Sequence, residues 1–168
     1  LELNQRIKNV ADLNKQIATA QGVGGDTAAL RDQRDVVIRE IGQRMGARAI
    51  EDGTGRVALY AGGSVLVEGD NASTLSMDLE PNTGKMRFYA TGVAKSEITN
   101  RVDTGTLGGL REARDVDIAD TIDKLDAYAY DVANAFNAVH ATGYGLDSVN
   151  GRPLFTPPAT QKGAGGVM

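Results

Sequence analysis

The sequence predicts an α+β fold in which three long helices form a partial bundle and a small antiparallel β unit is inserted before the last helix. Apolar residues recur every three or four positions in residues 1–46 and again in residues 105–143, which is typical of helices. Between them the apolar residues alternate at every second position and glycine turns separate the runs, which is typical of strands. These changes of period predict a helical hairpin at 1–46, the β unit at 47–104, a long helix at 105–143, and a loop with a flexible tail at 144–168.

The first helix is predicted over residues 1–20, and its apolar positions follow a seam that packs against another helix. The seam consists of Leu3, Ile7, Val10, Asn14 and Ile17. A polar residue such as Asn14 on a seam of this kind typically fixes the register of two helices. The glycine-rich stretch at 22–26 then ends the helix and supplies Asp26 as an N-cap for the next one.

The second helix is predicted over residues 27–45, with a buried stripe made of Leu30, Arg34, Val37, Ile41 and Met45. Because Arg34 lies on this stripe, it needs an acidic partner, and Asp117 and Asp120 are the candidates. Asp32 and Asp35 lie three positions apart and could bind a metal. The interleaved arginines neutralise them, however, so a structural role is the favoured interpretation.

The β unit is predicted as an antiparallel meander of five short strands, with a possible sixth at 95–99. The strand sequences are "ARAIED", "RVALYA", "SVLVEG", "STLSMDLE" and "KMRFYATG". The stretches "DGTG", "GG", "GDN" and "PNTG" between them are turn signals. Hairpin turns of this kind make consecutive strands neighbours.

The third helix is predicted over residues 107–141, with a length of about 50 Å at 1.5 Å per residue. Its apolar residues keep a four–three spacing over three heptads, and we expect them to carry tertiary contacts. They are Ile118, Ile122, Leu125, Ala129, Val132, Phe136 and Val139. The glycine in "ATGYG" suits the end of this helix.

Composition excludes several classes of function. The chain of 168 residues has 18 basic and 22 acidic residues, and it has no long basic run, so it lacks the charge pattern of a nucleic-acid binder. Since it contains no Cys, disulfides, thiolate catalysis and cysteine-ligated metals are excluded. No apolar stretch approaches the roughly 20 residues that span a bilayer, so no membrane partner is expected.

Three features have some character of a catalytic or binding site, and a structural interpretation is favoured for each. "GTLGGLREARD" at 105–115 resembles a phosphate loop only in its glycines, because it lacks the Lys and Ser/Thr that hold the phosphate and its metal. His140, the only histidine, could act as a base with Asp131 or Asp147, although packing or helix capping is favoured. "DSVNG" lacks the ligand spacing of a calcium loop. No catalytic, cofactor or metal site is therefore predicted.

Five stretches in sequence resemble the flagellar hook-associated protein 1 (FlgK) family. They are "LRDQRDVVIREIG", "GGSVLVEGD", "GTLGGLREARD", "LDAYAYDVANAFNAVHATGYGLD" and "GRPLF". They occur in the order of the family, and the resemblance extends over nearly the whole chain, from Leu3 to Phe155. Leu154 stands where the family often has Phe. The motif and packing residues are Leu30, Asp32, Gln33, Arg34, Asp35, Leu66, Gly108, Gly109, Leu110, Phe136, Asn137, His140 and Gly143.

The resemblance implies a non-enzymatic, structural component of the junction between hook and filament. It implies export by the flagellar type III route without a signal peptide, an extracellular location on the flagellum, and an export chaperone for the full-length protein. Its expected partners are other copies of itself, the hook protein and the second junction protein. The terminal regions of the family are absent from this chain, so we expect a central piece that exposes an apolar stripe and self-associates.

Three alternatives stay open on sequence alone. One is another flagellar axial protein. Another is a binding module whose β unit grips a glycan or a protein, with Tyr60, Phe88 and Tyr89 in its strands. The third is a hydrolase built on His140.

Overall fold

The computed structural model describes residues 2–156 and 160–164. Its contacts divide the chain into two compact units, unit 1 at Leu1–Asp115 and unit 2 at Val116–Met168. Each unit is described by itself. The four-part organisation that the sequence periods suggest stays a prediction.

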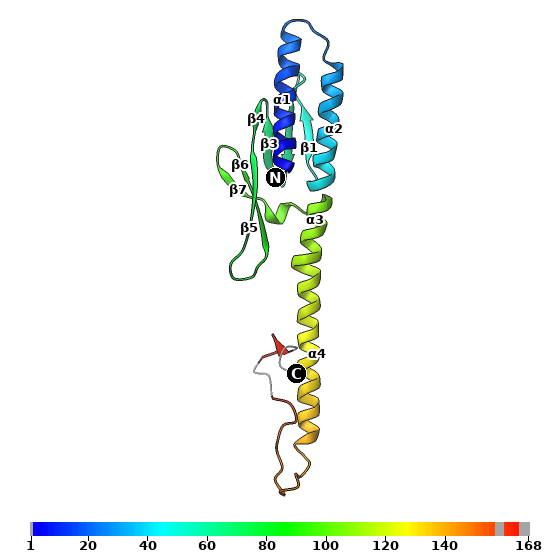
Figure 1. Ribbon diagram of the computed structural model, residues 1–168, viewed down its shortest axis with the longest axis vertical. Helices are drawn as coiled ribbons and strands as arrows, with labels where there is room; N and C mark the ends of the chain where they lie inside the picture. Colours follow the sequence, from blue (N-terminus) through cyan, green and yellow to red (C-terminus); the bar gives the residue numbers. More distant parts are fainter. Residues whose placement is uncertain (1, 157–159, 165–168) are drawn as a thin grey trace. The chain divides into compact units, whose positions relative to one another are not determined.

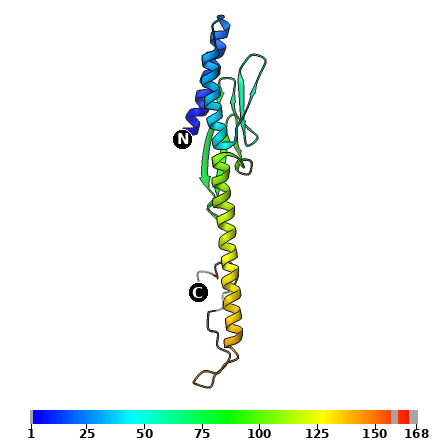
Figure 2. The same ribbon diagram turned by 90° about the vertical axis from the view of Figure 1, so that its right-hand side faces the viewer.

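Unit 1 begins with a helical hairpin, as predicted. Helix α1 (Glu2–Gly22) lies beside α2 (Ala28–Met45), and both views of the ribbon show the two helices side by side (Figures 1 and 2). Thr27 is the N-cap residue of α2, so the prediction of Asp26 at that position was wrong by one residue. Asp26 lies just before it, and its Oδ1 accepts the N–H of Ala28 at 2.9 Å. The helix ends at Gly46, whose φ of +67° is the left-handed conformation that glycine adopts at a helix C-terminus.

The β unit has seven strands in two antiparallel sheets, so the prediction of one meander was wrong. The first sheet has the order β1-β2-β3-β4 and the second β5-β6-β7. Their bounds are β1 (Arg48–Glu51), β2 (Val57–Ala61), β3 (Ser64–Glu68), β4 (Asn71–Ala72), β5 (Thr74–Leu79), β6 (Met86–Thr91) and β7 (Lys95–Glu97). The two-residue β4 is too short to show an alternating pattern. It ends the first sheet at Ala72, two residues before β5 begins the second sheet at Thr74.

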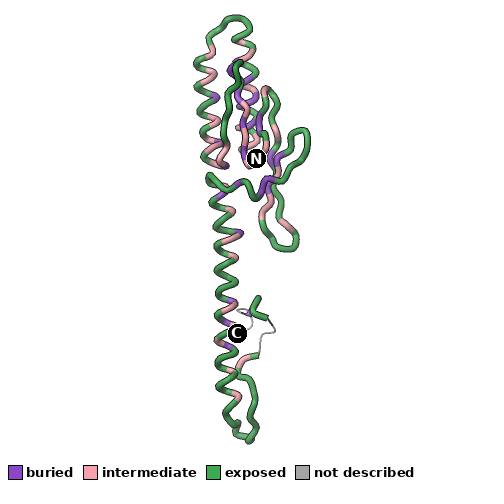
Figure 3. Tube along the Cα trace, turned by 180° about the vertical axis from the view of Figure 1, so that it is seen from behind, coloured by how far each residue is buried: buried purple, intermediate pink, exposed green. Residues whose placement is uncertain are grey.

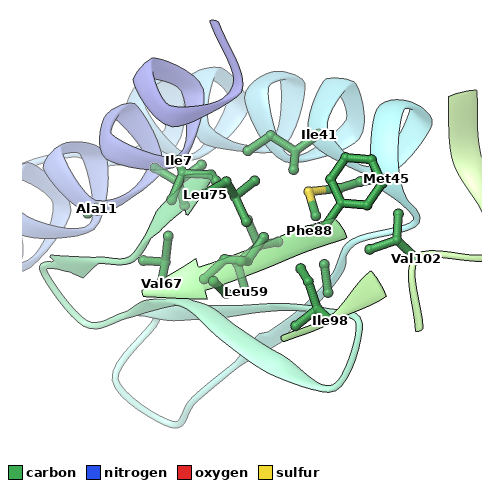
Figure 4. Packing of buried hydrophobic residues seen from close by; sticks show 14 residues of the cluster. Ile7, Ala11, Ile41, Met45, Leu59, Val67, Leu75, Phe88, Ile98 and Val102 are labelled. Carbon is green, nitrogen blue, oxygen red and sulfur yellow. The ribbon is translucent and has the colours of Figure 1, made fainter. Parts of the chain in front are cut away.

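The core of unit 1 lies between the helical hairpin and the two sheets. Figure 4 shows Ile7 and Ile41 of the helices facing Leu59, Leu75 and Phe88 of the strands. Figure 3 shows the same concentration of buried backbone where α1 faces the strands. Burial of one such side chain contributes about 1.5–3 kcal/mol. Of the predicted seam, Ile7, Val10, Asn14 and Ile17 are indeed fully buried.

The predicted third helix consists of three helical segments and follows a short 3₁₀ turn, η1 (Thr99–Arg101). The segments are α3 (Gly105–Glu112), a π-helical turn η2 (Ala113–Asp117), and α4 (Ile118–His140). The π turn directs two side chains at the β5–β6 hairpin: Asp115 accepts the N–H of Met86 at 3.1 Å and Arg114 donates to the carbonyl of Gly84 at 2.9 Å. α3 packs against α2 within unit 1.

The expectation that the apolar repeat of α4 carries tertiary contacts was largely wrong. Ala129 is buried, but Ile118, Ile122, Leu125, Phe136 and Val139 are 54–74% exposed. We call these five residues the α4 stripe. Their spacing of four and three places them on one line along the helix. The structure therefore has the exposed apolar stripe that the sequence led us to expect.

Candidate functional site

The glycines at the start of α3 allow close packing against the end of α2. Gly105 has a φ of +69°, and a Cβ built there would lie 2.7 Å from the carbonyl carbon of Arg44. A Cβ on Gly108 would lie 2.5 Å from the carbonyl carbon of Asp103. Both distances are too short for any real side chain. The glycines of "DTGTLGGL" therefore steer the chain into the helix, as the sequence favoured.

Gly108→Ala and Gly109→Ala should have opposite effects on stability. Gly108 meets backbone that cannot move aside, so we expect Gly108→Ala to lower the free energy of unfolding by about 1–3 kcal/mol. Gly109 has no atom within 4 Å of its built Cβ. Because alanine favours helix, Gly109→Ala should raise that free energy by about 0.5–1 kcal/mol. Urea unfolding of the two variants measures this difference, and a Gly108→Ala protein as stable as the parent would contradict the packing role.

The motif "LRDQRD" has one fully buried member, Arg34, which is 1% exposed. Leu30 is half-buried, whereas Asp32, Gln33 and Asp35 are exposed on α2. The prediction that Asp117 or Asp120 is the partner of Arg34 was wrong. Arg34 Nη1 donates to Asn14 Oδ1 at 3.0 Å and to the carbonyl oxygen of Gly55 at 2.8 Å.

Two carboxylates also lie near Arg34, at longer distances than these hydrogen bonds. Glu51 Oε2 is 3.7 Å from Nη2, and Asp35 Oδ1 is 4.0 Å from Nε. Burial lowers the pKa of Arg34, and the charge of Glu51 acts in the opposite direction. The nearest oxygens are neutral amide and carbonyl groups because the hairpin of β1 and β2 brings its turn against α2.

Asn14 links α1, α2 and the first sheet. Its Oδ1 accepts from Arg34 and also from the N–H of Val57 at 3.1 Å. Its Nδ2 donates to the carbonyls of Val57 and Gly69, both at 2.7 Å. The sequence indicated that Asn14 fixes a register. The structure extends that role to the position of the strands on the helical hairpin.

In unit 2, the motif "FNAVH" of α4 holds the segment that carries "GRPLF". Asn137 Oδ1 accepts the N–H groups of Leu154 and Phe155, both at 2.8 Å, and its Nδ2 donates to the carbonyl of Phe155 at 3.0 Å. The rings of Phe136 and Phe155 pack edge to face with centroids 6.2 Å apart. His140 Nδ1 lies 2.9 Å from the carbonyl oxygen of Arg152, so this nitrogen carries the proton. We call this set of contacts the α4 clasp.

Asn137→Ala should release the clasp without unfolding unit 2. The amide hydrogens of Leu154 and Phe155 lose their acceptor. With about 1 kcal/mol for each lost hydrogen bond, their exchange with solvent should be roughly tenfold to a hundredfold faster. Hydrogen exchange followed by NMR measures these two amides directly.

Asn134→Ala is the matched control for that measurement. Asn134 is exposed on the same helix, and its replacement should leave the exchange of Leu154 and Phe155 unchanged. Equal protection of the two amides in the Asn137→Ala protein would show that the clasp does not hold the segment.

A second contact fastens the chain beyond the clasp. Asp126 Oδ2 accepts the N–H of Gly163 at 2.6 Å, and Ala164 is buried. Asp126 was not singled out in the sequence, because an aspartate within an acidic helix gives no distinguishing signal. The loop after α4 is held by Asp147, which pairs with Arg152 at 2.6 Å.

The hydrolase alternative depended on His140 with Asp131 or Asp147. His140 is engaged with the carbonyl of Arg152, and Asp147 with the guanidinium of the same residue. Gly143 belongs to the turn after α4, where its N–H donates to the carbonyl of His140 at 3.1 Å. These contacts give His140 a structural role in the clasp.

The β unit places its aromatic residues mostly inward. Phe88 is buried, and Tyr60 and Tyr89 are half-buried. Burial raises the pKa of Tyr89, whose ring lies 3.9 Å from the ammonium of Lys95. Leu66 is fully buried in the core of unit 1, whereas Leu110 on α3 is 62% exposed. A glycan site typically displays exposed aromatic rings, so this arrangement does not favour one.

Among residues 2–156 and 160–164, no group of three or more His, Cys, Asp and Glu side chains is placed to hold a metal ion. Within the same residues, no helix has the length and apolar character needed to cross a membrane. In the described chain, the α4 clasp and the glycine contact of α3 are packing contacts, and the α4 stripe is an exposed apolar surface.

These features define a structural module of long helices and antiparallel strands. The family model for the flagellar hook-associated protein FlgK helical domain matches residues 1–155. The chain therefore belongs to the FlgK family.

Curated relatives support the same family. Flagellar hook-associated protein 1 of Salmonella typhimurium is 32% identical over 162 residues, which cover 92% of this chain and 29% of the relative. The protein of the same name from Bacillus subtilis is 28% identical over 201 residues, with 100% of this chain and 39% of the relative covered. The chain thus spans well under half the length of these relatives.

A solved structure has the same fold. The flagellar hook junction protein FlgK from Burkholderia pseudomallei superposes with a TM-score of 0.73 at 24% sequence identity. The match covers 92% of this chain and 29% of that chain.

Proposed function

We propose that this chain is part of a structural protein at the junction between the hook and the filament of a bacterial flagellum, without catalytic activity. Family membership over residues 1–155 is the observation that carries the proposal. The names of the relatives, hook-associated protein and hook junction protein, support it.

The α4 stripe fits this role. A seven-residue apolar repeat drives helices to pack side by side, and rods of packed helices suit a tubular assembly that bears mechanical load. Helices from other parts of the intact protein then cover the stripe. The motif residues identified in the sequence, from Leu30 to Gly143, serve packing in this arrangement.

The partners and location follow from the same role. The protein is exported by the flagellar type III route with the help of a chaperone and resides on the flagellum outside the cell. There it contacts further copies of itself, the hook protein and the second junction protein. The absence of Cys from the chain suits export in an unfolded form to an oxidising exterior.

Deletion of the full gene in the source bacterium tests the proposal. We expect bare hooks, loss of swimming, and flagellin released into the medium, because filament subunits have no platform on which to assemble. Re-expression of the intact gene should restore filaments. Normal filaments and motility in the deletion strain would overturn the proposed function.

A further inference from the structure

A polar hollow in unit 1 has no role in the packing described above. Its volume is about 360 Å³, and it lies between the end of α2, the turn from β2 to β3, and the segment that leads into α3. Arg48 of β1 and Arg101 of η1 both line it, so two arginines from different elements share one concave surface. We call this surface the arginine hollow.

Neither of these arginines has a side-chain partner in the described part of the chain. Most arginines of the protein make a side-chain hydrogen bond or an ion pair, as Arg31 does with Glu51. Among residues 2–156 and 160–164, the exceptions are Arg39, Arg48, Arg56 and Arg101. Only Arg48 and Arg101 of these line the hollow. Their guanidinium donors are therefore available to a ligand.

The turn from β2 to β3 adds backbone donors to the lining. Gly62 and Gly63 have φ values of +54° and +69°, which favour glycine. Their N–H groups have no acceptor within the described residues, and backbone turns with free N–H groups form anion-binding concavities. Arg101 lies directly against this turn, since a Cβ built on Gly63 would lie 2.9 Å from its Nη1.

The charge balance of the lining is positive. Asp103 is the one acidic residue that lines the hollow, and it forms no ion pair with either arginine. The end of α2 at Gly46 adds about half a negative charge, so the two guanidinium groups still outweigh the negative groups around them. The hydroxyl of Thr104, which makes no capping hydrogen bond to α3, adds a neutral donor. This excess occurs in a chain whose net charge is −4.

We propose that the arginine hollow binds a phosphate group. Guanidinium groups hold phosphate oxygens through paired, charge-assisted hydrogen bonds. A tetrahedral phosphate presents oxygens in several directions, so it accepts from Arg48, Arg101 and the glycine turn together. A carboxylate presents two oxygens in one plane and satisfies fewer of these donors. The inference does not depend on the proposed function, because the hollow lies wholly within unit 1 of the chain.

Titration of the purified 168-residue chain with inorganic phosphate, followed by ¹H–¹⁵N NMR, tests the site. At constant ionic strength, the amide signals of Gly62 and Gly63 should shift and saturate. The arginines are exposed to solvent, so we expect weak binding with a dissociation constant of about 1 mM. Gly53 lies in a turn at a different place and does not line the hollow, so its amide signal should not move.

Three variants connect these shifts to the hollow. Arg48→Gln with Arg101→Gln should weaken phosphate binding by about tenfold or more, because both charged donors are lost. Arg39→Gln with Arg56→Gln is the matched control: it removes two equally unpaired charges outside the hollow and should leave the dissociation constant unchanged. Asp103→Asn should strengthen binding by about threefold, because the carboxylate no longer repels the anion. A misfolded protein could not show this gain.

Glycerol phosphate as a second probe distinguishes the free ion from a phosphate group on a larger molecule. Equal affinity for both probes identifies the phosphate group itself as the ligand, whereas binding of inorganic phosphate alone identifies the free ion; both results support the site. The inference is overturned if neither probe gives saturable shifts at Gly62 and Gly63, or if chloride at the same ionic strength gives equal shifts. Unchanged affinity in the Arg48→Gln, Arg101→Gln protein would also overturn it.

Discussion

Asn14→Leu should lower the free energy of unfolding by about 3–5 kcal/mol, because several buried polar groups lose their partner and each costs about 1–3 kcal/mol when it is left unpaired. Asn14 is fully buried and makes four hydrogen bonds. Leucine has a similar size but no polar atom. The guanidinium of Arg34 and the backbone groups of Val57 and Gly69 would then remain buried with fewer partners, and such groups are costly to desolvate.

Urea unfolding of the purified chain measures this loss, and Asn9→Ala provides the control. Asn9 lies on the same helix, is half-exposed and bonds only the side chain of Gln5, so its replacement should change stability by about 0.5 kcal/mol or less. Arg34→Met should cost about 1–3 kcal/mol, because Asn14 keeps its bonds to the strands while the carbonyl of Gly55 loses its donor. Unchanged stability in Asn14→Leu would mean that the polar cluster is dispensable.

The helical hairpin could be predicted because both of its helices bury one face within the chain. The periodic positions of Ile7, Val10 and Ile41 then coincide with the observed core. The same pattern correctly indicated that Arg34 is buried but gave the wrong partner. Asn14 was already a polar residue on the facing seam, so pairing the two seams would have found it. The spacing of residues along one helix does not by itself show which residue of a neighbouring helix a side chain contacts.

The exposure of the apolar face of α4 could not be predicted from residue spacing. The spacing of apolar residues identifies the apolar face of a helix but not whether another element covers that face. Ile118 and Ile122 follow the same rule as Ile7 and Val10, yet they are more than half exposed. What distinguishes them is the absence of a packed helix within the described residues of unit 2.

The sequence identified some of the residues that form the α4 clasp. The resemblance singled out Phe136, Asn137 and His140, and the structure brings all three to the segment that contains Leu154 and Phe155. Sequence reasoning could not join them, because the loop after α4 sets their contact and its path is decided by turn geometry. Ser148, with a φ of +62°, is one such turn residue.

The second large effect concerns the α4 stripe. The purified 168-residue chain should self-associate as its concentration rises, and it should bind an apolar dye, because exposed apolar patches of this kind drive association. Replacing Ile118, Ile122 and Leu125 together with serine should abolish both properties. Burial of one such side chain contributes about 1.5–3 kcal/mol, so removing three weakens association by at least a thousandfold.

Light scattering over a concentration series measures the self-association of the parent chain and of the serine variant and so tests this prediction. Val23→Ser with Val93→Ser is the control: these side chains are 82% and 111% exposed but stand alone in turns, so association should persist. A parent chain that stays monomeric and binds no dye would contradict the packing role of the stripe. In the full-length protein, loss of filaments in the triple serine variant but not in the control would place the stripe in the assembled junction, as the proposed function expects.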